Sequence, residues 1–131
     1  MKFWVITSVL LCSIGANQVG VNIIPEGLFV KPNGTIYIPL PAKASYRRTV
    51  TNPKTYQLED EHIYRVCNGK NKAKCGFWED VKTKKKVPSG ATSYNKTKKA
   101  LVIKKFRTTD EGVYTATGNK KLVFQIWVFD W

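Results

Sequence analysis

The chain has 131 residues, with 22 basic and 9 acidic side chains and a formal net charge of +13. It has one histidine, no visible nucleophile motif, and no mature apolar run of the roughly 20 residues that a membrane-spanning helix needs, which argues against an enzyme and against a transmembrane span. The charge attracts polyanions such as sulfated glycans, nucleic acid or anionic lipid headgroups, but it says nothing about the fold.

Residues 1–16 have the pattern of a secretory signal peptide. Lys2 precedes an apolar run from Phe3 to Leu11, and the small residues Gly15 and Ala16 follow, where a signal peptidase cleaves. We therefore expect a secreted, extracellular protein whose mature part, residues 17–131, forms a single domain of about 115 residues. An uncleaved N-terminal anchor is the alternative.

The cysteines and two sequons agree with secretion. Cleavage removes Cys12 and leaves Cys67 and Cys75 in an oxidising compartment, where we expect them to pair and stabilise the fold by about 2 to 3 kcal/mol. A bond to a second chain is the alternative to this short loop. Asn33 and Asn95 begin Asn-x-Thr sequons and are predicted glycosylation sites if they lie on the surface.

The first part of the mature chain predicts short strands. Residues 28–30 and 36–40 flank a Lys-Pro-Asn-Gly turn, and this pattern is typical of a hairpin. Pro39 and Pro41 cannot donate ladder hydrogen bonds, so the second strand should end there or lie near an edge. Residues 42–61 show no clear pattern, and they leave room for an extra hairpin.

The rest of the mature chain also predicts short strands joined by turns. Residues 62–66 and 76–81 predict a hairpin clamped by the cysteines, and residues 82–90 are polar enough for a solvated edge or loop. Residues 100–106 predict a strand, residues 113–117 another, and a Gly118-Asn119 turn leads to a last strand over residues 122–129. Near-regular strand spacing without helical periodicity predicts an all-β, antiparallel two-sheet sandwich.

One stretch narrows the fold. The run Asp110-Glu111-Gly112-Val113-Tyr114-Thr115-Ala116, seven residues after Leu101-Val102-Ile103, resembles the Asp-x-Gly-x-Tyr-x-Cys motif of immunoglobulin-superfamily (V/I-set-like) domains. The resemblance implies an immunoglobulin-like sandwich in which Tyr114 is buried and its hydroxyl bonds back to the upstream turn. It also implies that Gly112 allows the backbone to fold tightly beneath Tyr114.

The chain departs from the family pattern at the core disulfide. The two intersheet cysteine positions fall on Leu40 and Ala116, so an apolar pair replaces the bond. The family's buried tryptophan has no clear counterpart, and Tyr64 or Trp78 could fill its place.

The last strand carries the candidate protein-binding residues. If Phe124, Ile126 and Val128 point inward, then Trp127 and Phe129 point outward, with Trp131 just beyond. Exposed aromatic surface usually marks an interface, and the resemblance implies that this outer face is a common partner site. Coverage by residues 46–56, or a register slipped by one, is the alternative.

Lysines form the other candidate surface. Alternation predicts that the hairpin-tip lysines lie on one side of a strand, and together with the next lysine run they could bind a sulfated glycan. These residues are Lys70, Lys72, Lys74, Lys82, Lys84, Lys85 and Lys86. A solvated surface that keeps the protein soluble is the plainer interpretation, and a specific nucleic-acid site is not expected.

No cofactor or metal is expected. The segment Glu59-Asp60-Glu61-His62 could hold a metal only if its side chains converged, and consecutive strand residues point to opposite sides. The sequence therefore predicts an extracellular recognition module that binds a protein partner, or itself, through Trp127 and Phe129. The alternative is a cationic effector that acts on sulfated glycans or anionic membranes.

Overall fold

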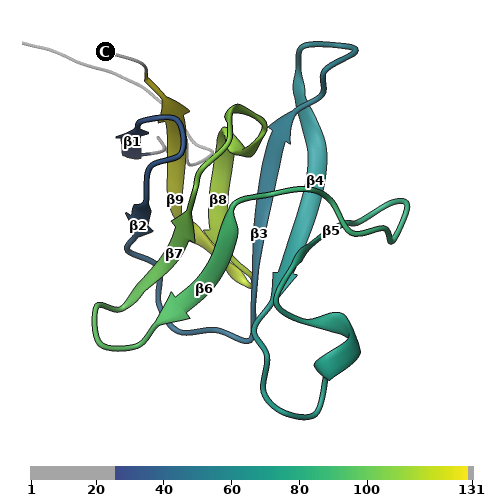
Figure 1. The fold of residues 1–131 in the computed structure, drawn as a ribbon, viewed down its shortest axis with the longest axis vertical. Coiled ribbons are helices and arrows are strands. Elements are labelled where there is room, and N and C mark those ends of the chain that lie inside the picture. The colour runs from purple at the N-terminus through teal and green to yellow at the C-terminus, as the bar shows by residue number, and fades with distance from the viewer. Residues whose placement is uncertain (1–25, 130–131) are drawn as a thin grey trace, which may run out of the picture.

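The computed structural model describes residues 26–129, which form two β-sheets (Figure 1). The large sheet has the order β1-β9-β8-β3-β4-β5 and the small sheet the order β2-β7-β6. The strands are β1 (Glu26–Val30), β2 (Ile36–Ile38), β3 (Ser45–Thr51), β4 (Leu58–Arg65), β5 (Trp78–Asp80), β6 (Ala91–Asn95), β7 (Ala100–Lys104), β8 (Gly112–Ala116) and β9 (Asn119–Val128). The predicted signal peptide, Cys12 and Trp131 lie outside the described residues.

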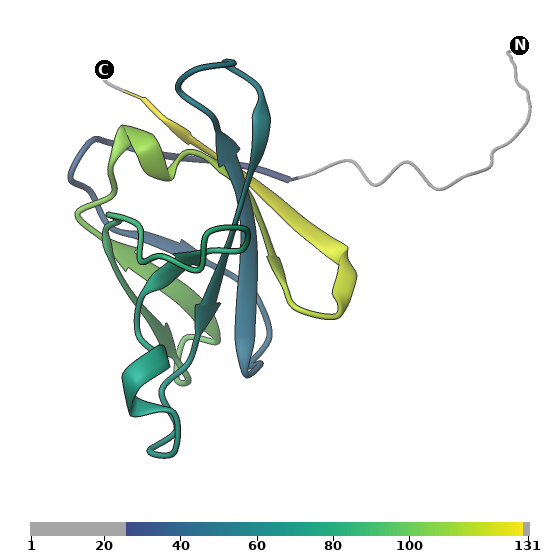
Figure 2. The ribbon, with the colours of Figure 1, turned by 90° about the vertical axis from the view of Figure 1, so that its right-hand side faces the viewer.

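The two sheets pack against each other around one apolar core, and Figure 2 shows this layering from the side. Every strand that contributes to the core turns alternate residues inward, as a half-buried strand must. The predicted all-β, immunoglobulin-like sandwich is confirmed, with the addition that β1 runs parallel to β9. Within residues 26–129 no helix could cross a membrane, and the helical segments there are the short 3-10 turns η2 (Lys72–Lys74) and η3 (Thr108–Asp110).

The predicted hairpin between residues 28–30 and 36–40 is wrong. β1 pairs with β9 in the large sheet, whereas β2 pairs with β7 in the small sheet, so the turn carries the chain from one layer to the other. Val30 and Ile36 are both buried and enter the core from opposite layers, which a simple hairpin would not allow. As predicted, β2 ends before Pro39 and lies at a sheet edge.

Residues 42–61, which showed no clear pattern, contain β3 and the first half of β4. β3 lies next to β8, and the residue opposite Ala116 is Tyr46, which is fully buried. Neither Tyr64 nor Trp78 therefore fills the family's tryptophan position, because Tyr64 lies on β4 and Trp78 on β5. The sequence alone could not choose because the strand next to β8 had not been located.

Tyr46 is held by hydrogen bonds as well as by packing. Its hydroxyl donates to the carbonyl of Pro41 at 2.7 Å and accepts the backbone N–H of Lys43 at 3.0 Å. Its ring stacks on Tyr94 from β6, with centroids 5.8 Å apart. Leu40, one of the two positions where the family has a cysteine, is also buried in this core.

The connection from β7 to β8 has the geometry that the resemblance implies. Tyr114 is fully buried, and its hydroxyl donates to the carbonyl oxygen of Asp110 at 2.5 Å. Close packing against β3 requires a glycine at position 112. A Cβ placed there would lie 2.2 Å from the carbonyl oxygen of Thr49 on β3. A side chain at position 112 would therefore push β8 away from β3.

Two further elements differ from the sequence prediction. β6 was not predicted as a strand, because its sequence Ala-Thr-Ser-Tyr-Asn is mostly polar. β9 begins at Asn119, so the tight turn is Thr117-Gly118 rather than Gly118-Asn119, and Gly118 takes the positive φ of 84° that this turn requires.

Gly112→Ala should lower the free energy of unfolding by about 1 to 3 kcal/mol, because the added methyl group overpacks the β3–β8 contact. Gly27→Ala is the matched control, since its Cβ would meet only Trp127 at 3.9 Å, an ordinary contact. Urea unfolding of the two variants measures the difference. Equal destabilisation by both substitutions would contradict the role given to Gly112.

Candidate interaction surface

The large sheet turns one set of alternate side chains away from the core, and we call this side the outer face. Strand pairing aligns its residues in rows, for example Arg47 beside Thr115 and Thr115 beside Val123. The outer face comprises Gly27, Phe29, Ser45, Arg47, Thr49, Thr51, Leu58, Glu61, Ile63, Arg65, Glu79, Val113, Thr115, Val123, Gln125, Trp127 and Phe129.

Aromatic rings dominate one end of the outer face. Phe29, Trp127 and Phe129 are 59%, 43% and 55% exposed. Phe29 lies opposite Trp127 in the β1–β9 pair, and its ring lies 5.6 Å from that of Phe129. The parallel pairing of β1 with β9 thus gathers three large rings from two distant parts of the sequence.

The surface is hollowed in two places. A groove of about 200 Å³ is lined by Thr51, Leu58, Glu111 and Trp127, among others, so the β3–β4 hairpin forms one wall and β9 the other. A second groove of about 540 Å³ runs over the middle of the sheet, where Thr49, Val113 and Val123 line it. Both grooves offer apolar surface that a partner side chain could fill.

The charged side chains of the outer face form ion pairs. Arg47 and Glu61 lie 3.9 Å apart and are about half exposed, and Arg65 and Glu79 lie 3.1 Å apart toward the β5 edge. Its central paired positions include no lysine, although the chain as a whole is strongly basic; Lys121 lies near the start of β9, and Lys86 pairs with Glu79 at the β5 edge. Aromatic enrichment with lysine depletion is the composition typical of the centre of a protein interface.

A buried ionic network lies directly beneath this surface. Arg48, between Arg47 and Thr49 on β3, points inward and is 2% exposed. Its Nη1 donates to Oδ1 of Asp110 at 2.8 Å and to the Tyr114 hydroxyl at 2.9 Å, and its Nε donates to Nδ1 of His62 at 3.0 Å. The network therefore links β3, β4 and β8 with the turn that precedes β8.

Asp110 accepts from several further donors. The Ser89 hydroxyl donates to Oδ1 at 2.6 Å, and the backbone N–H groups of Gly90 and Arg107 donate to Oδ2 at 3.0 and 2.9 Å. Burial raises the pKa of this carboxyl, but Arg48 and these donors outweigh it and hold the pKa below its ordinary value. The aspartate is therefore ionised and fully paired.

Aromatic rings enclose the guanidinium. The Arg48 carbon Cζ lies 4.4 Å from the centroid of the Trp78 ring, and Trp78 packs edge-on against Tyr114. Burial raises the pKa of the Tyr114 hydroxyl well above its ordinary value, so it stays protonated and can donate to Asp110. Trp78 thus covers the ion pair from β5 and shields it from solvent.

His62 is held in its neutral form. Burial lowers the pKa of the imidazole, and the neighbouring Arg48 guanidinium lowers it further. The neutral ring is the form that can accept the bond from Arg48 through Nδ1. His62 therefore contributes to the internal network and not to the surface.

The sequence-predicted aromatic residues lie where alternation placed them. Phe124 and Ile126 are buried, while Trp127 and Phe129 are exposed, so the register predicted for β9 is confirmed. The segment 46–56 does not cover them, since it forms β3 and the following turn. Leu122 is 37% exposed, so the inward series begins at Phe124.

The sequence analysis missed two apolar residues of the outer face. Phe29 was assigned to a hairpin with β2, and Leu58 lay in the segment without a clear pattern. Both reach the outer face through long-range strand pairing, for which the local sequence carries no signal. The adjacent apolar residues Leu28 and Phe29 were the available hint, because alternation in a strand turns one of the two away from the core.

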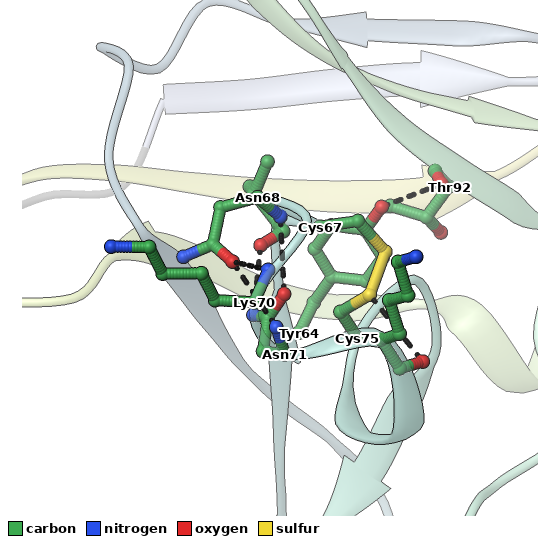
Figure 3. The surroundings of a disulfide bond; sticks show 9 residues. Tyr64, Cys67, Asn68, Lys70, Asn71, Cys75 and Thr92 are labelled. Atoms are coloured by element: carbon green, nitrogen blue, oxygen red, sulfur yellow. Dashed lines mark hydrogen bonds between the residues drawn. A yellow bond between two sulfur atoms is a disulfide. The ribbon is translucent and has the colours of Figure 1, made fainter.

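The hairpin-tip lysines are not on a strand. The disulfide between Cys67 and Cys75 is present, as predicted, and closes a loop between β4 and β5 that contains η2 (Figure 3). The Asn68 and Asn71 side chains bond to backbone N–H groups inside the loop and fold it into turns. Lys70, Lys72 and Lys74 are exposed there, and Figure 3 shows Lys70 pointing away from the disulfide.

The second lysine run forms the turn after β5, with Lys82, Lys84, Lys85 and Lys86 all exposed. Asp80 stabilises that turn by accepting the N–H groups of Lys82 and Thr83, and these bonds lower its pKa. The carboxylate of Asp80 therefore lies within the turn that carries the lysines proposed from the sequence for polyanion binding.

The sequon residues differ in exposure. Asn33 is exposed in the turn between β1 and β2, whereas Asn95 is half-buried at the end of β6 and its Oδ1 accepts the N–H of Lys98. Their glycosylation stays a prediction. Among residues 26–129 no group of three His, Cys, Asp or Glu side chains is close enough to hold a metal ion.

No protein-family model matches the chain, and no curated protein matches it. A similar solved structure is described as "Parallel homodimer structures of the extracellular domains of the voltage-gated sodium channel beta4 subunit explain its role in cell-cell adhesion". It is 13% identical, has a TM-score of 0.43, and the match covers 88% of this chain and 92% of that chain. A likeness this distant says nothing about what the present chain binds.

Arg48→Met and Asp110→Asn should each lower the free energy of unfolding by about 3 to 5 kcal/mol, because each leaves a buried charged group without its partner. The double variant should cost less than the sum, since neither charge is then orphaned. Arg47→Met is the control, because its exposed ion pair is worth at most about 1 kcal/mol. Strictly additive losses in urea unfolding would rule out the coupling.

The free energy of unfolding should also fall as the pH drops below about 6.5. The unfolded chain then binds a proton at His62, whereas the folded protein, in which the pKa of His62 is lowered, does not. The slope can reach about 1.4 kcal/mol per pH unit. His62→Gln keeps an acceptor for Arg48 and should flatten the curve just below the unfolded pKa of about 6.5. Asp110 acts in a lower window, since its unfolded pKa is 3.8. An unchanged slope in the variant would refute the assignment.

Proposed function

We propose that the chain is an extracellular recognition module that binds a protein partner through the outer face of its large sheet. The observation that carries the proposal is the cluster of exposed aromatic rings on a face whose central paired positions include no lysine, on a strongly basic protein. Proteins rarely leave several large rings together in water unless they contact something. The grooves beside Trp127 and over Val113 provide sites for partner side chains.

The strand order supports a variable-type immunoglobulin domain. In such domains two extra strands extend the sheet that carries the last two strands of the chain. Here β4 and β5 follow β3 in the same sheet as β8 and β9 and occupy that place. Because β4 lengthens the outer face, Leu58 and Ile63 join the residues of β9 in one continuous surface.

The function is association and involves no chemical step. The one histidine is buried and already bonded to Arg48, and Cys67 and Cys75 are joined to each other. Secretion, suggested by the first 16 residues, would place the outer face in contact with other cells or secreted proteins.

Trp127→Ala should weaken binding of the mature protein to partner-bearing cells by about 10- to 100-fold, as expected for the central aromatic residue of an interface. Cells are treated with heparinase before the assay, so that binding to sulfated glycans does not contribute. Tyr37→Ala is the matched control, because Tyr37 is 44% exposed, close to the 43% of Trp127, but lies on the small sheet.

Sedimentation velocity at rising protein concentration tests whether the partner is a second copy of the chain. Self-association that Trp127→Ala abolishes would identify the homodimer, and a monomer that still binds cells would identify a different protein. Unchanged cell binding and unchanged sedimentation by a folded Trp127→Ala protein would sink the proposal.

A further inference from the structure

Acidic residues are absent from the segments that form the small sheet. Residues 31–44 and 86–109, which build the whole small sheet and its connections, contain nine basic residues and no acidic one. These are Lys31, Lys43, Lys86, Lys96, Lys98, Lys99, Lys104, Lys105 and Arg107. All nine acidic residues of the chain fall outside these two segments.

The outward side of the small sheet therefore carries charge of one sign, and we call it the lysine face. Small side chains occupy the middle of this face, where Ala91, Ser93, Ala100 and Val102 point away from the core. The β6–β7 turn supplies exposed Lys96 and Lys99 at one end. Lys104, Lys105 and Arg107 are exposed at the other end.

The spacing of the cations suits an extended ligand. Lys99 and Lys104 are five residues apart along β7, which corresponds to about 17 Å in a strand. Lys98 fills the interval, because its Nζ lies 4.4 Å from the centroid of the Tyr37 ring, and Tyr37 is level with Val102 in the middle of the sheet. Positive charge thus runs along the whole length of β7.

Both ends of this track open into grooves. One groove, of about 380 Å³, is lined by Lys96 and Lys99 together with Tyr94. The other, of about 350 Å³, has Lys86, Arg107 and Ser89 among its lining residues. An anionic group reaching beyond either end of β7 would therefore still lie beside cations.

Two of the lysines have a backbone that does not favour lysine. Lys99 and Lys105 have φ values of 53° and 54°, the left-handed region that favours Gly or Asn. Local conformation therefore does not explain why lysine occupies either position.

We propose that the lysine face binds a linear sulfated polysaccharide of the extracellular matrix or cell surface, laid along β7. This goes beyond the proposed function, because it assigns a second surface on the opposite sheet, but it shares the extracellular location. Anionic membrane is the poorer match: the exposed apolar anchors that membrane-surface binding uses, Phe29, Trp127 and Phe129, lie on the other sheet.

The proposal also moves the polyanion site away from the lysine runs that the sequence first suggested. The turn after β5 contains the carboxylate of Asp80, which partly offsets its charge. On the lysine face the nearest carboxylate in sequence, Asp110, is buried and paired with Arg48.

The test is binding of the mature protein to a heparin dodecasaccharide at ionic strengths around the physiological 0.15 M. Lys99→Asn with Lys105→Asn should weaken binding about tenfold or more, and should reduce the slope of log affinity against log salt by about 2. The thermal midpoint should not fall, since Asn tolerates the left-handed backbone better than Lys does.

Lys84→Asn with Lys85→Asn is the matched control. It removes the same charge, and Lys84 has the same left-handed backbone, with φ of 64°. The proposal requires less than about twofold loss in this variant, because a purely long-range effect is screened at this salt. Equal losses in the two double variants, or no loss in the first, would overturn it.

Vesicles of phosphatidylserine and phosphatidylcholine provide the last comparison. Tighter binding to these vesicles than to the heparin fragment, abolished by Lys99→Asn with Lys105→Asn, would assign the lysine face to membranes and overturn the proposal. Because the saccharide assay contains no protein partner, it can fail while the function proposed for Trp127 stands, and the reverse.

Discussion

The buried ion pair between Arg48 and Asp110 fixes the geometry on which both surfaces depend. Arg48 comes from the inner side of the large sheet, and Asp110 from the turn that leads out of the small sheet. A one-residue slip of β3 would turn the buried side chains of Tyr46 and Val50 outward and move Arg48 away from Asp110. The ion pair and these two apolar side chains therefore specify together which β3 residues face outward, and with them the middle of the outer face.

This ion pair acts where a covalent link between the sheets is absent. Leu40 and Ala116 pack in the core as apolar residues, and the disulfide between Cys67 and Cys75 closes only a loop outside the sandwich. Burying two charges has a desolvation cost, which the Tyr114 hydroxyl, Ser89 and two backbone N–H groups offset by hydrogen bonding. The two sheets are therefore held in register by directional noncovalent bonds in place of a covalent one.

The sequence predicted those elements whose pattern is local. Alternation in β9 placed Trp127 and Phe129 outward, and the residues from Asp110 to Tyr114 identified the β7–β8 connection. β3 could not be recognised, because a buried arginine has the same pattern as a solvated one when its partners lie 14 and 62 residues away. Likewise, Phe29 reaches the aromatic end of the outer face only through parallel pairing with a strand nearly a hundred residues later.

The parallel pairing of β1 with β9 also determines how the domain would carry tension along its chain. The chain enters the pair at Glu26 and leaves it after Val128, and Glu26 lies opposite Phe124 while Val30 lies opposite Val128. Forces applied at the entry and exit point away from each other along the two strands, so they slide one strand past the other. The connecting hydrogen bonds are then loaded together, rather than opened one by one as at the end of an antiparallel hairpin.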